Sequence, residues 1–133
     1  MSESLELAAW VRVAEEDYSL ARVTLRRKAP LTYGACFHAQ QCAEKSLKAA
    51  LAALKQPFPH VHDLTALSDL CTRSGFIIGM NADDLDSLSS YAVRARYPGQ
   101  QPTLEEAREA IRIATTVRRL LRRYLGLDVG RTF

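Results

Sequence analysis

Two stretches of the sequence carry polar and basic side chains at spacings that suit a phosphate ligand. The first stretch places four of them on one stripe of a predicted helix: His38, Gln41, Lys45 and Lys48. The second places three at the end of another predicted helix, where the chain enters a Pro-Gly loop: Arg94, Arg96 and Tyr97. Arg presents a planar fork of donors that matches an oxyanion, and Lys adds a point charge. If the two stretches meet, they predict a phosphate-binding site in which Tyr97 stacks on a base.

Both stretches also have plain structural interpretations. The first stripe fits a solvated helix face, on which Glu44 forms an ordinary surface pair with Lys48 one turn later. Arg94 and Arg96 fit a helix carboxyl end, where cations satisfy the last carbonyl groups and the helix dipole. The net charge of +3 does not separate these interpretations from a phosphate site, because a solvated Arg-rich face gives the same total.

A second candidate for chemistry is the run His60-Val61-His62-Asp63, since two His beside an acid can begin a metal site. No third ligand follows at a familiar spacing, and Asp63 is already explained as the N-cap of the next helix. We therefore predict no metal and no cofactor, and we expect His62 to brace the start of that helix.

The standard catalytic signatures are absent from the sequence. It contains no Gly-rich phosphate loop, nucleophile elbow or zinc-protease motif, and no catalytic residue is predicted. Its three cysteines, Cys36, Cys42 and Cys71, lie on helix faces that are predicted to be buried, which favours reduced, unreactive thiols. Reduced thiols are typical of a cytoplasmic protein, and no apolar stretch is long enough to span a membrane. We expect a cytoplasmic protein without membrane contact.

The elements that must position these residues are all predicted to be helices. Apolar residues recur at steps of three and four in five segments: 5–28, 35–55, 64–74, 82–95 and 104–125. Prolines or glycines follow each segment, and residues 32–34 are predicted to form the break before the second. Three long and two short helices with short connections favour an all-α, antiparallel up-and-down bundle over residues 1–126. Residues 127–133 form a predicted tail, which we expect to fray.

Three helix starts carry capping residues. Asp63 and Asn81 are good N-caps for the third and fourth helices, and Thr103 with Glu106 forms a capping box for the fifth. The second helix is rich in Ala at its inward positions, which permits close packing against its neighbours.

Three segments together resemble the HEPN family of small prokaryotic helical proteins: 35–54, 59–67 and 91–99. The residues that carry the resemblance are a Gln-Gln-x-x-Glu-Lys-x-x-Lys pattern, a His-Asp-Leu before a short helix, and an Arg-Tyr-Pro ending. In this sequence they are Gln40, Gln41, Glu44, Lys45, Lys48, His62, Asp63, Leu64, Arg96, Tyr97 and Pro98. The resemblance covers residues 5–125 and suggests the small stand-alone prokaryotic type.

The resemblance implies an antiparallel helical bundle, commonly a homodimer. It also implies a link to toxin-antitoxin or defence systems, often beside a minimal nucleotidyltransferase. Many HEPN proteins are metal-independent RNases in which an Arg is followed after four to six residues by a His. Here the corresponding positions after Arg94 and Arg96 hold no imidazole: Gly99, Gln100, Gln101, Pro102 and Thr103. Cleavage through a 2′-hydroxyl requires a proton acceptor with a pKa near neutrality, which Gln and Arg do not supply.

The favoured function from sequence is therefore a dimeric, non-catalytic HEPN-like module that binds a nucleotide or RNA phosphate and works beside a nucleotidyltransferase partner. The predicted phosphate ligands are Lys45, Lys48, Arg94, Arg96 and Tyr97, supported by His38, Gln41 and His62. Two alternatives stay open. One is a toxin-like RNase that uses His38 or His62 in place of the missing His, and the other is an interaction dimer without a ligand.

Overall fold

The computed structural model describes residues 3–58 and 60–129, which form five helices. In chain order they are α1 (Glu3–Arg26), α2 (Thr32–Ala53), α3 (Leu64–Arg73), α4 (Ala82–Arg94) and α5 (Leu104–Tyr124). The all-α bundle with three long and two short helices is thereby confirmed. No helix within the described ranges is both long enough and apolar enough to cross a membrane.

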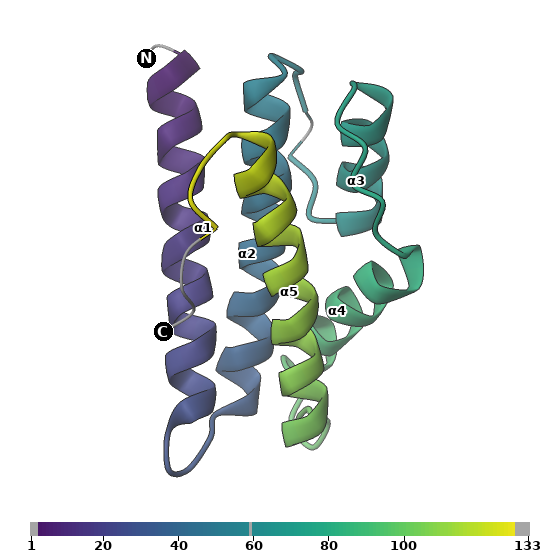
Figure 1. Ribbon diagram of the computed structural model, residues 1–133. Coiled ribbons are helices and arrows are strands. Elements are labelled where there is room, and N and C mark those ends of the chain that lie inside the picture. The colour runs from purple at the N-terminus through teal and green to yellow at the C-terminus, as the bar shows by residue number, and fades with distance from the viewer. Residues whose placement is uncertain (1–2, 59, 130–133) are drawn as a thin grey trace.

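The second helix is the centre of the fold. α1 and α2 form an antiparallel pair, and α5 lies beside them (Figure 1). α2 contacts each of the other four helices. α3 and α4 stand between α2 and α5 in the chain, and α4 crosses obliquely toward the start of α5, so that α5 runs in the same direction as α2 (Figure 1). This arrangement leaves one side of α2 facing α1 and another facing α3 and α4.

Contacts within α2 and with α1 explain where α2 begins. The prediction of a break over residues 32–34 was wrong, because the helix starts at Thr32 and the backbone N–H of Ala35 already donates to Leu31. Tyr33 stacks on Phe37 one turn later, with ring centroids 6.3 Å apart. A Cβ at Gly34 would lie 3.0 Å from Cγ2 of Thr24, so glycine at this position allows α1 and α2 to approach closely.

The predicted helix caps are confirmed. The Asp63 side chain accepts hydrogen bonds from the backbone N–H groups of Thr65 and Ala66, at 3.0 and 3.3 Å. Asn81 caps α4, and the capping box of Thr103 and Glu106 is formed at α5. These contacts satisfy backbone donors that have no partner inside the helix, and they fix the residue at which each helix starts.

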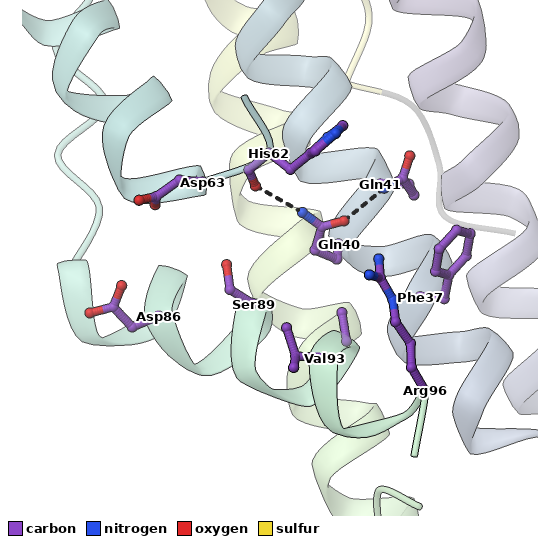
Figure 2. Close-up of a pocket in the computed structure, with 10 residues that line it drawn as sticks. Phe37, Gln40, Gln41, His62, Asp63, Asp86, Ser89, Val93 and Arg96 are labelled. Carbon is purple, nitrogen blue, oxygen red and sulfur yellow. Dashed lines mark hydrogen bonds between the residues drawn. The ribbon is translucent and has the colours of Figure 1, made fainter. Parts of the chain in front are cut away.

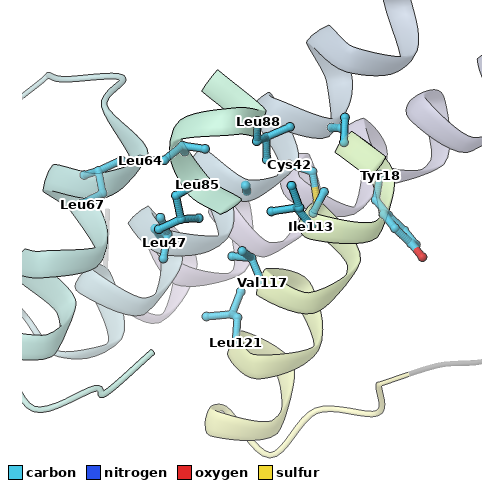
Figure 3. Packing of buried hydrophobic residues seen from close by; sticks show 14 of the residues in the cluster. Tyr18, Cys42, Leu47, Leu64, Leu67, Leu85, Leu88, Ile113, Val117 and Leu121 are labelled. Atoms are coloured by element: carbon cyan, nitrogen blue, oxygen red, sulfur yellow. The ribbon is translucent and has the colours of Figure 1, made fainter. Parts of the chain in front are cut away.

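The hydrophobic core follows the predicted helix stripes. Its largest fully buried apolar side chains come from α2, α3, α4 and α5. They include Leu51 and seven residues labelled in Figure 3: Leu47, Leu64, Leu67, Leu85, Leu88, Ile113 and Val117. The small residues of α2 are buried against them, as predicted. Cys36, Cys42 and Cys71 are free and buried, which confirms that they are core residues.

The first residues of the predicted tail are bound to α5. Nη1 of Arg118 donates to the carbonyl oxygen of Val129 at 2.8 Å, and Nε of Arg122 donates to that of Asp128. Glu15 of α1 accepts two hydrogen bonds from Arg118, at 2.6 and 2.7 Å. Fraying was expected after Gly126, but side chains of α5 bind the carbonyl oxygens of Asp128 and Val129. The remainder of the predicted tail, residues 130–133, lies outside the described residues.

Candidate functional site

A groove lies between α2, α4 and the start of α3. Its volume is about 580 Å³, which is within the range typical of small-molecule sites. Ten residues line it: Phe37, Gln40, Gln41, His62, Asp63, Asp86, Ser89, Ala92, Val93 and Arg96. Figure 2 shows these side chains gathered around Gln40, with Asp63 and Asp86 toward one end and Arg96 and Phe37 toward the other.

Helix periodicity explains why these residues share the groove. On α4 and its continuation, Asp86, Ser89, Val93 and Arg96 follow at steps of three, four and three, which places them on one face. The backbone N–H of Arg96 donates to Val93, so the chain still winds as a helix where Arg96 leaves it. Phe37, Gln40 and Gln41 face them from α2, and residues 62 and 63 close the remaining side.

A buried ion pair lies on α2 next to Gln40 of the groove wall, whose side-chain amide donates to Glu44. Nζ of Lys48 lies 3.1 Å from Oε2 of Glu44, and the two residues are only 5% and 3% exposed. Lys48 also lies over the Trp10 ring of α1, 5.6 Å from its centroid. The prediction that Glu44 and Lys48 form an ordinary surface pair was therefore wrong, because α1 and the segment before α3 cover this side of α2.

The same carboxylate holds His62. Nδ1 of His62 lies 3.1 Å from each oxygen of Glu44, and the backbone carbonyl of His62 accepts a hydrogen bond from Gln40 at 3.3 Å. Gln41 in turn donates to Gln40 (Figure 2). The His62 side chain is 78% exposed, so its other ring nitrogen is open to the groove or to solvent. Glu44 and Gln40 thus hold His62, just before α3, against α2, which agrees with the predicted role of His62 at the start of that helix.

His38 and Lys45 lie on a different side of α2. Asp17 of α1 is 6% exposed and bridges them, with Oδ1 at 2.8 Å from Nδ1 of His38 and Oδ2 at 2.6 Å from Nζ of Lys45. Neither side chain lines the groove. This three-membered cluster joins α1 to α2.

Arg94 points toward α5. Its Nη2 lies 2.6 Å from Oε2 of Glu106, and its guanidinium lies over the Tyr91 ring, 5.6 Å from the centroid. The backbone N–H of Thr103 and the Arg94 guanidinium hold the pKa of Glu106 below its usual range. Arg94 therefore connects the end of α4 to the capping box that begins α5.

The structure does not bring together the four predicted cations. Lys45, Lys48 and Arg94 each meet a carboxylate, on α1, α2 and α5 respectively, so the expected convergence was wrong. Arg96 differs from them: it is exposed, it lines the groove, and its side chain has no hydrogen-bond or ion-pair partner in residues 3–58 and 60–129. Tyr97 is 54% exposed and lies outside the groove lining. Phosphate binding by these five residues remains a prediction.

Most of the groove was missed from sequence. Seven of its ten lining residues were not predicted ligand contacts: Phe37, Gln40, Asp63, Asp86, Ser89, Ala92 and Val93. The spacing of residues 86, 89, 93 and 96 was a usable signal, because it places a polar edge on the same helix face as Arg96.

The run of residues 60–63 does not form a metal site with its surroundings. His60 lies apart from the groove, beside Trp10 and Phe58, while Asp63 caps α3. Among the described residues no group of three or more His, Cys, Asp or Glu side chains is arranged to hold a metal ion.

Comparison with known proteins gives one match. The profile of the HEPN domain family matches residues 7–124, which confirms the resemblance seen in the sequence, while the stand-alone prokaryotic type stays a prediction. No curated protein and no solved structure was found to match the chain. Since the family profile spans all five helices and both walls of the groove, the chain belongs to the HEPN domain family.

Proposed function

We propose that this protein is a HEPN module that binds a nucleotide or an RNA phosphate in the groove between α2 and α4, without cleaving it. Family membership supports a nucleotide- or RNA-related role in general terms. The observation that carries the proposal is Arg96, a cation in the groove whose side chain has no carboxylate partner among residues 3–58 and 60–129.

The rest of the lining suits such a ligand. A guanidinium binds phosphate through strong charge-assisted hydrogen bonds, and Phe37 offers an aromatic surface beside it. Gln40 and Gln41 add amide groups on the wall of α2. Asp63 and Asp86 repel phosphate from the opposite end, so a bound nucleotide places its phosphate at Arg96.

Substitution of Arg96 tests this proposal. Arg96→Ala is expected to weaken binding of a fluorescein-labelled single-stranded RNA by about 1–3 kcal/mol, because a charge-assisted contact to phosphate is lost. The slope of the logarithm of affinity against the logarithm of salt concentration should become shallower by about one, because one fewer counterion is released on binding. The melting temperature should change little, since Arg96 is exposed. Fluorescence anisotropy at several salt concentrations measures both.

Lys45→Ala is the matched control. The sequence alone predicts the same loss of affinity for this variant, but in the structure Lys45 is bound to Asp17 on another side of α2. We expect Lys45→Ala to keep RNA affinity and to lower the melting temperature, because Asp17 loses one of its two partners. Unchanged affinity in Arg96→Ala would leave Arg96 with a structural role only and would favour the interaction dimer without a ligand.

A second candidate is a metal-independent RNase, and the position of His62 favours it over His38. His62 and Arg96 line the same groove, and Glu44 binds Nδ1 of His62. With the proton on Nδ1, Nε2 could take the proton of a 2′-hydroxyl while the 2′-oxygen attacks phosphorus. The bond between phosphorus and the 5′-oxygen then breaks, and the 5′-oxygen takes up a proton from water. His38 binds Asp17 outside the groove.

We expect mixed RNA to stay intact with the pure protein, because the family's Arg-to-His spacing is absent. Gel analysis with and without EDTA measures this. Cleavage that resists EDTA, persists in His38→Ala and disappears in His62→Ala would establish the RNase instead.

We also propose a homodimer. Four large apolar side chains near the turn between α1 and α2 are exposed: Leu20, Val23, Leu31 and Tyr33. Burying them against a second copy removes apolar surface from water, and the family resemblance implies the same assembly. Light scattering at micromolar concentration should give twice the chain mass of 14.8 kDa, and a value equal to the chain mass would refute the dimer.

The wider setting rests on the resemblance alone. We propose a cytoplasmic prokaryotic module that works with a minimal nucleotidyltransferase in a toxin-antitoxin or defence system. A nucleotidyltransferase encoded by the adjacent reading frame, and its co-purification with this protein, would support that partnership. An adjacent gene of another class would argue against it.

A further inference from the structure

The two ends of the groove differ in charge and in hydrogen-bonding character. Arg96 at one end only donates, whereas Asp63 and Asp86 at the other end, when ionised, only accept (Figure 2). We infer that the acidic end selects guanine, with the Asp86 carboxylate accepting from the base while Arg96 holds the phosphate. This inference rests on the proposed function, because it names the base of the nucleotide bound in the same groove.

Asp86 is held in place for this role. Oγ1 of Thr65, in the first turn of α3, donates to Oδ1 of Asp86 at 2.8 Å. A carboxylate offers about four lone-pair sites, so Asp86 can keep this hydrogen bond and still accept two more. In contrast, Oδ1 of Asp63 already accepts from two backbone N–H groups as the cap of α3. Asp63 therefore contributes negative charge, and Asp86 is the better acceptor for a base.

The distance along α4 suits one nucleotide. Asp86 and Arg96 lie on the same helix face, ten residues apart, which corresponds to a rise of about 15 Å. The long Arg96 side chain extends into the groove toward Gln40, and Ser89 lines the groove between Arg96 and Asp86 (Figure 2). A mononucleotide with its phosphate at Arg96 therefore places its base toward the acidic end.

Among the standard bases, guanine matches a carboxylate best. Its Watson-Crick edge carries two adjacent donors, N1–H and the N2 amino group, which can bind both oxygens of one carboxylate. Adenine and cytosine place an unprotonated ring nitrogen beside their amino group, and this lone pair would face a carboxylate oxygen. Uracil has a single imino donor between two carbonyl oxygens. Each of these three bases thus places one of its hydrogen-bond acceptors against an oxygen of the carboxylate, and two facing acceptors repel each other in a partly desolvated groove.

Isothermal titration with four mononucleotides tests the inference: GMP, IMP, AMP and dGMP. GMP should bind at least about fivefold more tightly than AMP, which is the lower end of the discrimination given by a bidentate pair to a base. IMP keeps N1–H but lacks the amino group, so its affinity should lie between them. dGMP should bind as GMP does, because the contact is to the base.

Two substitutions complete the test. Asp86→Asn should abolish the preference for GMP and leave AMP binding equal or stronger, because an amide donor replaces an acceptor and a negative charge is removed. Asp69→Asn makes the same charge change on α3 at an exposed residue outside the groove, and it should keep the preference. Melting temperatures of both variants check that they fold.

The outcomes separate this inference from the proposed function. Equal binding of GMP and AMP, with both weakened by Arg96→Ala, would overturn guanine selection and leave the phosphate site intact. Equal binding of GMP and AMP with weaker binding of dGMP would show that the acidic end binds the ribose. A GMP preference that survives in Asp86→Asn would overturn the role of Asp86. If the original protein bound none of the four mononucleotides, guanine selection would be contradicted. If it also failed to bind the labelled RNA, the proposed function would be contradicted as well.

Discussion

Glu44→Ala is expected to lower the free energy of unfolding by about 3–5 kcal/mol, since breaking a buried ion pair leaves an uncompensated charge. Lys48 is 5% exposed, and Glu44 is its ion-pair partner within the described chain. The substitution also removes the acceptor for His62, which fastens the start of α3 to α2. Urea denaturation monitored by circular dichroism at pH 7 measures the loss.

Two control variants test whether burial of the ion pair causes this loss of stability. Glu109→Ala breaks an exposed pair with Arg112 and should cost at most about 1 kcal/mol, because surface pairs are well solvated. Replacing both partners in the double variant Glu44→Leu/Lys48→Met removes the charge together with its partner, and it should restore much of the stability lost in Glu44→Ala. A loss in Glu44→Ala no larger than in Glu109→Ala would contradict the buried position of the pair.

Stability is also expected to fall steeply above pH 9. Burial, followed by the nearby Glu15 carboxylate, raises the pKa of the Cys42 thiol from 9.0 to about 12. Below pH 9 the thiol is protonated in both the folded and the unfolded chain, so it makes no pH-dependent contribution. Between pH 9 and about 12 the unfolded chain loses this proton and the folded chain keeps it. The free energy of unfolding then decreases by about 1.4 kcal/mol per pH unit for this thiol.

A cysteine variant isolates this effect from other titrating groups. Burial likewise raises the pKa of Cys36 and Cys71 to about 12, so these two thiols add to the same loss of stability. Cys42→Ala keeps all of these groups and removes one thiol. Urea denaturation between pH 8 and 10.5 should therefore show parallel curves below pH 9 and, above it, a slope that becomes shallower than that of the original protein by up to about 1.4 kcal/mol per pH unit. Curves that stay parallel above pH 9 would show that the Cys42 thiol is accessible to water.

The helices and their starts were predictable because their causes are local. Asp63, Asn81 and Thr103 each bind backbone N–H groups two or three residues ahead, so the sequence contains both partners. The apolar stripes have a similar basis, since any face with that periodicity must be buried against something. The start of α2 was missed because its cause lies partly in α1, where Thr24 packs against Gly34.

The opposite directions of the Arg94 and Arg96 side chains could also have been predicted from the sequence. Residues two apart on a helix point to nearly opposite sides, at about 100° per residue. Arg94 and Arg96 therefore could not both face the polar stripe of α2. In the structure Arg94 binds Glu106 of α5 and Arg96 lines the groove.

The sequence by itself determined the all-α fold, the helix caps, the buried cysteines and the family, because each of these depends on spacing along one stretch of chain. Only the tertiary structure decided which of the predicted cations has no carboxylate partner among the described residues. Lys45 is neutralised by Asp17, 28 residues before it, and Arg94 by Glu106, in a different helix. Lys48 has its partner one turn away, but whether that pair is solvated or buried depends on Trp10 of α1. Electrostatic partners and burial are set by distance in space, and the packing of α1, α3, α4 and α5 around α2 fixes those distances.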